Sequence, residues 1–271
     1  MSPRAVRPGA GLAYQLSGVA AIAQRDVLKL LRDRPRLAVN LAFPLFLVAG
    51  LGSLLQPTVG VVTGLNAVTL AFTGVLAATL FQSAAAGMIS IVEDREADFA
   101  RVLFVTPVSR ATLIAGKVCG ECLVALAQAG CVLAFAVAIG VPVPPGTLLA
   151  LVPACAGACL AGAGFGLVTV AVLPTQRSAM DVFQFLIIPQ YVLAGVLVPL
   201  RGTAPWLRAV SLAMPLRYAV DLTRAAYYAG TAGYRQAVTG GPLLDAVVTA
   251  GLAALFLVAG GLLFSYRERT R

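Results

Sequence analysis

The chain has 271 residues, of which 59% are hydrophobic and only 11% are charged, and its formal net charge is +9. Soluble domains carry about 25% charged residues, so a soluble fold could not bury this much apolar surface and lipid must surround most of the chain. The chain contains no histidine, which excludes histidine-based acid–base catalysis and histidine metal sites. We therefore predict an all-α polytopic membrane protein.

Residues 1–36 are predicted to form a cytoplasmic tail and an amphipathic connecting helix that ends at Pro35. The first residues lack the apolar core of a signal peptide. The helix has a basic face and an apolar face: Arg25, Lys29 and Arg32 against Val27, Leu28 and Leu31. Two roles stay open for this interfacial helix, namely anchoring on the lipid surface or docking against a partner protein.

The region 37–271 is predicted to be one membrane domain with six spanning helices, because a span needs about 20 predominantly apolar residues. The predicted spans lie near 37–55, 68–92, 122–141, 148–173, 182–200 and 244–264. Asp245, at the edge of the last span, is the only charged residue inside them. Carriers coupled to protons or sodium usually need ionisable groups at depth, so we expect any transport to draw its energy from outside the membrane.

The fourth span contains the run of small residues PACAGACLAGAGFG (153–166). Small residues let helix backbones approach closely, which predicts that this span packs tightly against its neighbours. The five cysteines are expected to be reduced packing residues, including the Cys119 and Cys122 pair.

Basic and neutral connections alternate along the chain, which predicts cytoplasmic termini and a multi-pass protein of the cell membrane. This assigns the positive charge to cytoplasmic connections and not to nucleic-acid binding. The connection 201–243 should be external, yet it holds five arginines. It reads as two short amphipathic helices, so we predict a re-entrant helical hairpin at the outer surface, with Arg217, Asp221, Arg224 and Tyr228 on one polar stripe.

The stretch 93–117 concentrates eight charged residues in 25 positions. A charged helix should continue from the second span, break at Thr106-Pro107, and restart with Ser109 as its cap. Such an elbow suits the groove of a partner, although a solvated connector is the alternative. The residues expected to contact that partner are Glu93, Asp94, Arg95, Glu96, Asp98, Arg101, Thr106, Pro107, Ser109 and Arg110.

Gly116-Lys117 invites comparison with a phosphate-binding loop, which needs a glycine five residues before the Gly-Lys pair and Ser or Thr after it. Those positions hold Ala111 and Val118. We therefore expect neither a nucleotide site nor a cofactor in this chain, and no enzymatic activity.

Three segments resemble type-2 ABC exporter permeases, the ABC-2 membrane family. They are LRDRPRLAVNLAFP (31–44), similar to the family's entry helix and first span; TPVSRATLIAGK (106–117), similar to its cytoplasmic connector; and LAGVLVPLRGTAPWLRAVSLAMPLRYAVDLTRAA (193–226), similar to its fifth span and external hairpin. The family signature P-L-x-Y-x-x-D-x-x-R falls on Pro215, Leu216, Tyr218, Asp221 and Arg224. Family members often carry a Gly-Thr pair and a Glu before Thr-Pro, where this chain has Asp98, Phe99 and Arg101.

The resemblance implies two permease subunits, identical or related, above two separate ATPase subunits that bind ATP and magnesium. The elbow 93–117 would insert into an ATPase groove, and the hairpin residues Pro215, Arg217, Tyr218, Asp221 and Arg224 would close the exit. Contact of Arg217, Asp221 and Arg224 with an anionic lipid or substrate headgroup is the alternative to a structural role.

The preferred function is therefore export of a hydrophobic or amphiphilic cargo, such as a drug, antibiotic or lipid. This would place the protein with drug-transport and antibiotic-resistance systems. Two alternatives stay open: a non-transporting scaffold that recruits an ATPase, and an ABC-2 permease that exports a polysaccharide or lipid-linked glycan.

Overall fold

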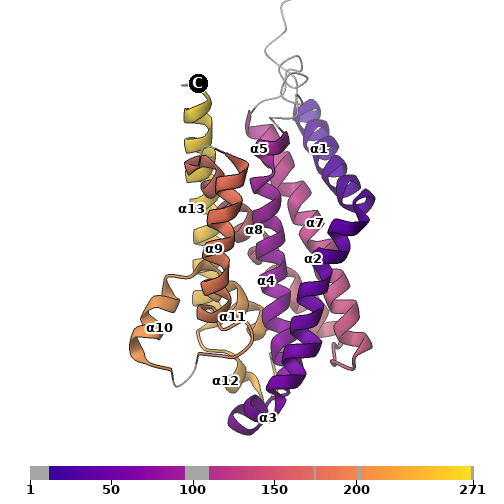
Figure 1. Ribbon diagram of the computed structural model, residues 1–271, viewed down its shortest axis with the longest axis vertical. Coiled ribbons are helices and arrows are strands. Elements are labelled where there is room, and N and C mark those ends of the chain that lie inside the picture. The colour runs from indigo at the N-terminus through magenta and orange to yellow at the C-terminus, as the bar shows by residue number, and fades with distance from the viewer. Residues whose placement is uncertain (1–11, 95–109, 174, 201–202, 270–271) are drawn as a thin grey trace, which may run out of the picture.

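The computed structural model describes residues 12–94, 110–173, 175–200 and 203–269, which form a bundle of helices (Figure 1). The helices are α1 (Leu12–Arg32), α2 (Arg34–Phe46), a π-helical turn η1 (Leu47–Leu51), α3 (Gly52–Thr63), α4 (Ala67–Ile89), α5 (Ile91–Asp94), α7 (Arg110–Ala138), α8 (Pro145–Val172), α9 (Gln176–Leu193), α10 (Pro205–Leu212), α11 (Pro215–Tyr227), α12 (Tyr234–Ala237) and α13 (Pro242–Arg269). The described residues contain no strand.

Five helical segments of the described chain are long and apolar enough to cross a membrane: Leu37–Thr63, Ala67–Ile89, Ala111–Ala138, Pro145–Val172 and Pro242–Phe264. The chain is therefore a multi-pass membrane protein. The segment predicted as the fifth of six spans falls on α9 and the turns after it. Helix α9 is not among the five because it is not apolar enough: its 18 residues include Arg177, Asp181 and three glutamines. The sixth span therefore stays a prediction.

The first apolar segment is longer than the predicted 37–55, because α3 continues to Thr63; within the segment the helix passes Pro44 and the π-helical turn η1 without a break. Proline lacks the N–H that a regular turn needs, and a local change in helical pitch accommodates the lost bond. Helix α3 ends at Gly64, whose φ of 68° is accessible to glycine. Asn66 then caps α4 by accepting a hydrogen bond from the Thr69 N–H at 3.1 Å.

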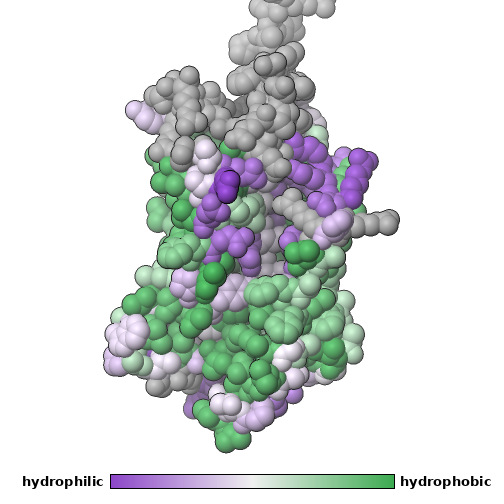
Figure 2. All heavy atoms as spheres, viewed as in Figure 1, coloured by the Kyte–Doolittle hydropathy of each residue, from purple (hydrophilic) through white to green (hydrophobic). Residues whose placement is uncertain are grey.

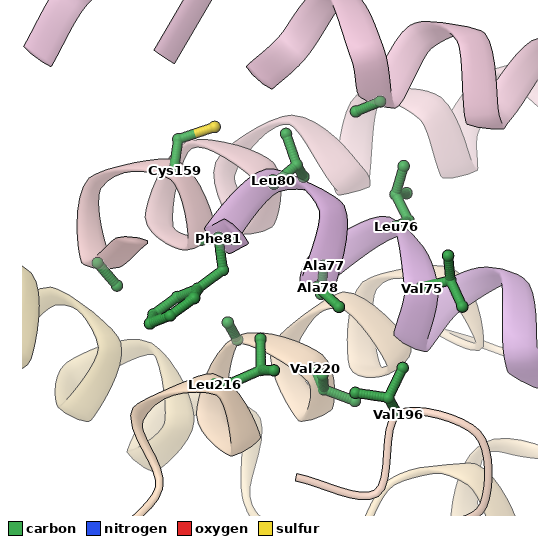
Figure 3. Close-up of a cluster of buried hydrophobic side chains, with 14 of the residues drawn as sticks. Val75, Leu76, Ala77, Ala78, Leu80, Phe81, Cys159, Val196, Leu216 and Val220 are labelled. Atoms are coloured by element: carbon green, nitrogen blue, oxygen red, sulfur yellow. The ribbon is translucent and has the colours of Figure 1, made fainter. Parts of the chain in front are cut away.

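Helix α4 is the centre of the bundle. Of the residues in its most apolar stretch, 83% are buried, against 22% for α13. Figure 3 shows Leu80 and Phe81 of α4 among side chains from α8, α11 and the segment after α9, including Cys159, Leu216 and Val196. A helix that is hydrophobic on all sides is stable when other helices cover it on all sides, and α4 meets that condition.

Helix α8 packs with its backbone almost in contact with α4, and glycines make this possible. A Cβ atom at Gly162 would lie 2.2 Å from the carbonyl oxygen of Phe81, and one at Gly166 would lie 2.3 Å from that of Ala85. On the other side of α8, a Cβ at Gly164 would lie 2.8 Å from the Cβ of Phe256 in α13. The close packing predicted from the small residues of 153–166 is confirmed.

Candidate functional site

Three charged side chains are buried together where α1 meets α7. The Lys117 amino group lies 3.3 Å from Oδ2 of Asp26 and 2.7 Å from Oε1 of Glu121. All three side chains are less than a tenth exposed. Asp26 Oδ1 also accepts a hydrogen bond from Nη2 of Arg25 at 3.0 Å. We call Asp26, Lys117 and Glu121 the charge cluster. Burial of a charge is tolerated when an opposite charge compensates it, as here.

Glycines of α7 bring α1 close enough for this pairing. A Cβ at Gly120 would lie 2.9 Å from Oδ2 of Asp26 and 3.0 Å from Cα of Ala23, and one at Gly116 would lie 3.0 Å from the side chain of Ile22. Nearer the start of α7, the Thr112 hydroxyl donates a hydrogen bond to the side-chain oxygen of Gln15 in α1. Helix α1 is thus bound along one face to the helix that follows the elbow.

The charge cluster also reaches the central helix. A Cβ at Gly87 of α4 would lie 1.7 Å from Oε2 of Glu121, so only glycine leaves room for this carboxylate. A pocket of about 60 Å³ adjoins the cluster, and α1, α2, α4 and α7 all contribute to its lining: Asp26, Lys29, Leu30, Asn40, Ser83, Ala86, Gly87, Ser90, Lys117, Glu121, Val124 and Gln128. Residues of four helices therefore line one polar pocket near one end of the bundle.

The charge cluster corrects the expectation that the spans contain no charge except Asp245. The third span was predicted to begin at residue 122, but α7 is one helix from Arg110, and its apolar segment includes Lys117 and Glu121. A signal was present in the sequence. Gly116 and Gly120, and likewise Lys117 and Glu121, are spaced at i and i+4, which marks a close helix contact beside an ion pair.

The elbow residues lie mostly outside the described part of the chain. Glu93 and Asp94 end α5, and Arg110 begins α7. The remaining predicted contact residues, Arg95, Glu96, Asp98, Arg101, Thr106, Pro107 and Ser109, fall outside the described residues. The flanking helices place both ends of the elbow at the end of the bundle where α1 packs against α7 (Figure 1).

The predicted basic residues of the connecting helix lie together on α1. Arg25, Lys29 and Arg32 line an open pocket of about 540 Å³ at the corner between α1 and α2. The pocket adjoins the charge cluster, because Lys29 lines both pockets and Arg25 bonds Asp26.

The signature residues of α11 connect three segments of the chain. Pro215 is in the first turn of α11. The Tyr218 hydroxyl donates to the Leu212 carbonyl at 2.7 Å, which joins α11 to the end of α10. Arg217 donates to the hydroxyl of Ser211. These contacts hold α10 and α11 as one unit, although whether that unit is re-entrant in the membrane stays a prediction.

Asp221 and Arg224 bind backbone groups of two segments outside α11. The Asp221 carboxylate accepts hydrogen bonds from the Thr239 N–H at 3.0 Å and the Gly240 N–H at 2.5 Å, before α13 begins. Arg224 donates to the carbonyls of Gly195 at 2.7 Å and Val196 at 3.0 Å, after α9 ends. The polar stripe therefore binds backbone groups of two other segments, which sequence periodicity does not reveal.

Arg224 is fully buried, and burial lowers its pKa to about 10, a shift that the nearby Asp221 opposes. The guanidinium therefore stays charged at neutral pH. Its carbonyl contacts compensate part of the cost of burying that charge.

Replacing Asp221 with asparagine should loosen the start of α13. An amide offers one acceptor oxygen where the carboxylate offers two, so the turn at Thr239 and Gly240 loses part of its support, at a cost of about 1–3 kcal/mol. Hydrogen–deuterium exchange should then accelerate at residues 238–246. Tyr218→Phe, which removes a single hydrogen bond, is the milder comparison; unchanged exchange in Asp221→Asn would contradict the assigned role.

Comparison with models of protein families matches residues 17–228 to the family described as ABC-2 type transporter. The match covers α1 to α11 and contains the charge cluster, the elbow and the signature residues. No curated protein matches the chain.

Proposed function

Because the chain belongs to the ABC-2 type transporter family, and is thus the permease subunit of a transporter, we propose that it exports a hydrophobic or amphiphilic compound by means of a separate ATPase. Members of this family work with an ATPase subunit, and they are typically non-catalytic membrane subunits. The proposal adds the direction, the cargo class and the route of coupling. The observation that carries it is the position of the charge cluster, directly between the two ends of the elbow and the central helix.

The proposed route of coupling begins at the elbow. The ATPase would hold the segment 93–110, and its closure would act on the first turns of α7. Helix α7 is bound to α1 by Lys117 and Asp26, and Glu121 reaches past Gly87 into α4. A displacement of the elbow would therefore reach the central helix through a short, buried ionic contact. Because this contact is closely packed, the displacement would be transmitted and not lost in side-chain rearrangement.

The cargo class rests on the character of the spans. Their exposed side chains are large and apolar, such as Val61 of α3, Leu149 of α8 and Leu255 of α13. These surfaces suit a hydrophobic or amphiphilic cargo, such as a drug, antibiotic or lipid. We further propose two permease copies, or this chain with a related one, above two ATPases, with both termini in the cytoplasm of a cell-membrane protein.

Gentle purification of the tagged protein from its native membrane tests the proposal. A nucleotide-binding subunit should co-purify in a fixed ratio and be lost when residues 93–110 are altered. Purification of the chain alone under mild conditions would count against ATPase coupling. Cargo should then be identified by ATP-dependent export in reconstituted vesicles, and a protein that binds an ATPase but moves nothing would be a scaffold.

Single changes in the elbow should uncouple transport without affecting membrane insertion. Glu93→Lys, Arg95→Glu, Asp98→Lys and Pro107→Ala should each weaken ATPase binding by about tenfold or more. The three charge reversals bring like charges together in the interface, which costs at least about 1.4 kcal/mol, and Pro107→Ala removes the predicted break between the two helices of the elbow. Export and ATPase co-purification are the readouts. Arg235→Glu, at an exposed arginine after α11, is the matched charge reversal and should bind the ATPase normally. Full export by all four elbow variants would show that the elbow is a solvated connector and does not couple the ATPase to transport.

A further inference from the structure

The corner between α1 and α2 forms an open, basic pocket of about 540 Å³ that the transport proposal does not use. Three cations, one carboxylate and two apolar residues line it: Arg25, Lys29, Arg32, Asp33, Leu28 and Pro35. Figure 2 shows hydrophilic residues gathered over α1 and this corner, while hydrophobic residues cover most of the lower half of the same face. The pocket thus lies where the polar and apolar surfaces of the molecule meet.

Helix α1 is bound to the protein by one face and leaves a second apolar strip uncovered. Its packed face carries Ala23 and Leu30, which are 6% and 7% exposed, together with Asp26 of the charge cluster. Leu28 and Leu31, on another side, are 41% and 58% exposed. The apolar face expected from the sequence is therefore not the face that packs on α7. Exposed leucines beside lysine and arginine are typical of a helix that lies in a lipid interface.

The helix that follows the pocket indicates the depth at which the pocket lies in the membrane. Pro35 lies two residues before Leu37, where the first apolar segment begins, so the pocket is about 3 Å along the helix from that segment. Within the segment, Val39 and Phe43 are 71% and 52% exposed, as residues facing hydrocarbon would be. The cations therefore stand at the depth of the lipid headgroups, directly above an exposed apolar surface.

We propose that this pocket binds the phosphate headgroup of an anionic phospholipid in the leaflet on the side of the elbow, with acyl chains against the exposed apolar residues of α1 and α2. Arginine and lysine bind phosphate through charge-assisted hydrogen bonds, and Arg25, Lys29 and Arg32 line the pocket together with one carboxylate, Asp33, while Arg25 also pairs with Asp26. A lipid fits this site better than an acidic protein surface, because only a lipid covers the leucines and the apolar segment below them. This inference does not depend on the cargo or on ATPase coupling.

Native mass spectrometry of the intact detergent-purified protein tests the proposal by counting retained phosphatidylglycerol and phosphatidylcholine. Each basic residue strengthens binding to an anionic lipid by about fivefold, so Lys29→Gln with Arg32→Gln should weaken phosphatidylglycerol binding by about 30-fold and leave phosphatidylcholine unchanged. Arg177→Gln, at an exposed arginine in the first turn of α9, is the matched control and should retain the lipid. The conservative Lys29→Arg with Arg32→Lys should also retain it.

Three results would overturn the inference. An equal loss of phosphatidylglycerol in Arg177→Gln would mean that the lipid is attracted to any arginine on that side of the membrane and not to this pocket. Displacement of phosphatidylglycerol by millimolar inorganic phosphate would mean a site for a free anion. Loss of a co-purifying ATPase in the Lys29→Gln, Arg32→Gln variant, with lipid retention intact, would assign the pocket to protein docking. Elution volume and helix content, compared with the parent protein, verify that each variant is folded.

Discussion

Replacing Lys117 with methionine is expected to destabilise the protein by about 3–5 kcal/mol, because it leaves buried carboxylates without their cation. Lys117 is 2% exposed and lies within 3.3 Å of Asp26 and 2.7 Å of Glu121. Asp26 keeps Arg25 as a partner, whereas Glu121 loses its ion pair with Lys117. Methionine has nearly the same length as the aliphatic part of lysine, so packing changes little and the charge is the variable.

Unfolding in mixed detergent micelles, followed by circular dichroism, measures this change. Lys29 is the only other lysine in the chain and is exposed, so Lys29→Met is the matched control and should shift stability by less than about 1 kcal/mol. Adding Glu121→Gln to Lys117→Met should recover part of the loss, because it removes the uncompensated charge. If Lys117→Met is as stable as the parent, the charge cluster does not hold α1, α7 and α4 together.

Replacing Gly162 with alanine should cost about 3 kcal/mol or more, because one methyl group must displace the backbone of a neighbouring helix. The new Cβ would lie 2.2 Å from the carbonyl oxygen and 2.7 Å from the Cα of Phe81. A flexible side chain could move aside, but a helix backbone cannot, so α4 and α8 must separate along their length. Loss of detergent-stable protein and a lowered unfolding midpoint are the expected readouts.

The same substitution at Gly130 is the control. Gly130 lies within α7, and a Cβ there would meet no atom within 4 Å. Gly130→Ala should therefore leave stability unchanged or raise it by up to about 1 kcal/mol, through the better helix propensity of alanine. Equal behaviour of the two variants would show that the α4–α8 contact tolerates separation, contrary to the structure.

Much of the fold follows from local sequence, because long apolar segments and helix-breaking residues act over short distances. The small residues of 153–166 predicted a tightly packed helix, and Gly162 and Gly166 provide that packing. The polar stripe of 217–224 predicted a structural role for the external segment. Its partners could not be predicted, since Asp221 and Arg224 bind backbone groups of residues 239–240 and 195–196, which periodicity does not identify.

The charge cluster was missed for a different reason. Hydropathy identifies a span by its average, and Lys117 and Glu121 lowered that average enough to place the predicted boundary after them, at residue 122. In the structure the pair neutralises itself and Asp26 arrives from a helix 91 positions earlier in the chain. Charge that is paired across helices does not prevent burial, so composition alone underestimates how far an apolar helix extends.

Helix α7 is longer than the hydrocarbon layer is thick. It runs unbroken through 29 residues, which is about 43 Å at 1.5 Å per residue, against roughly 30 Å of hydrocarbon. Lys117 and Glu121 lie about a quarter and two fifths of the way along it, where the helix contacts α1 and α4. If the helix tilted as a rigid body by about 10° around that contact, its far end would move by about 5 Å and its elbow end by about 2 Å.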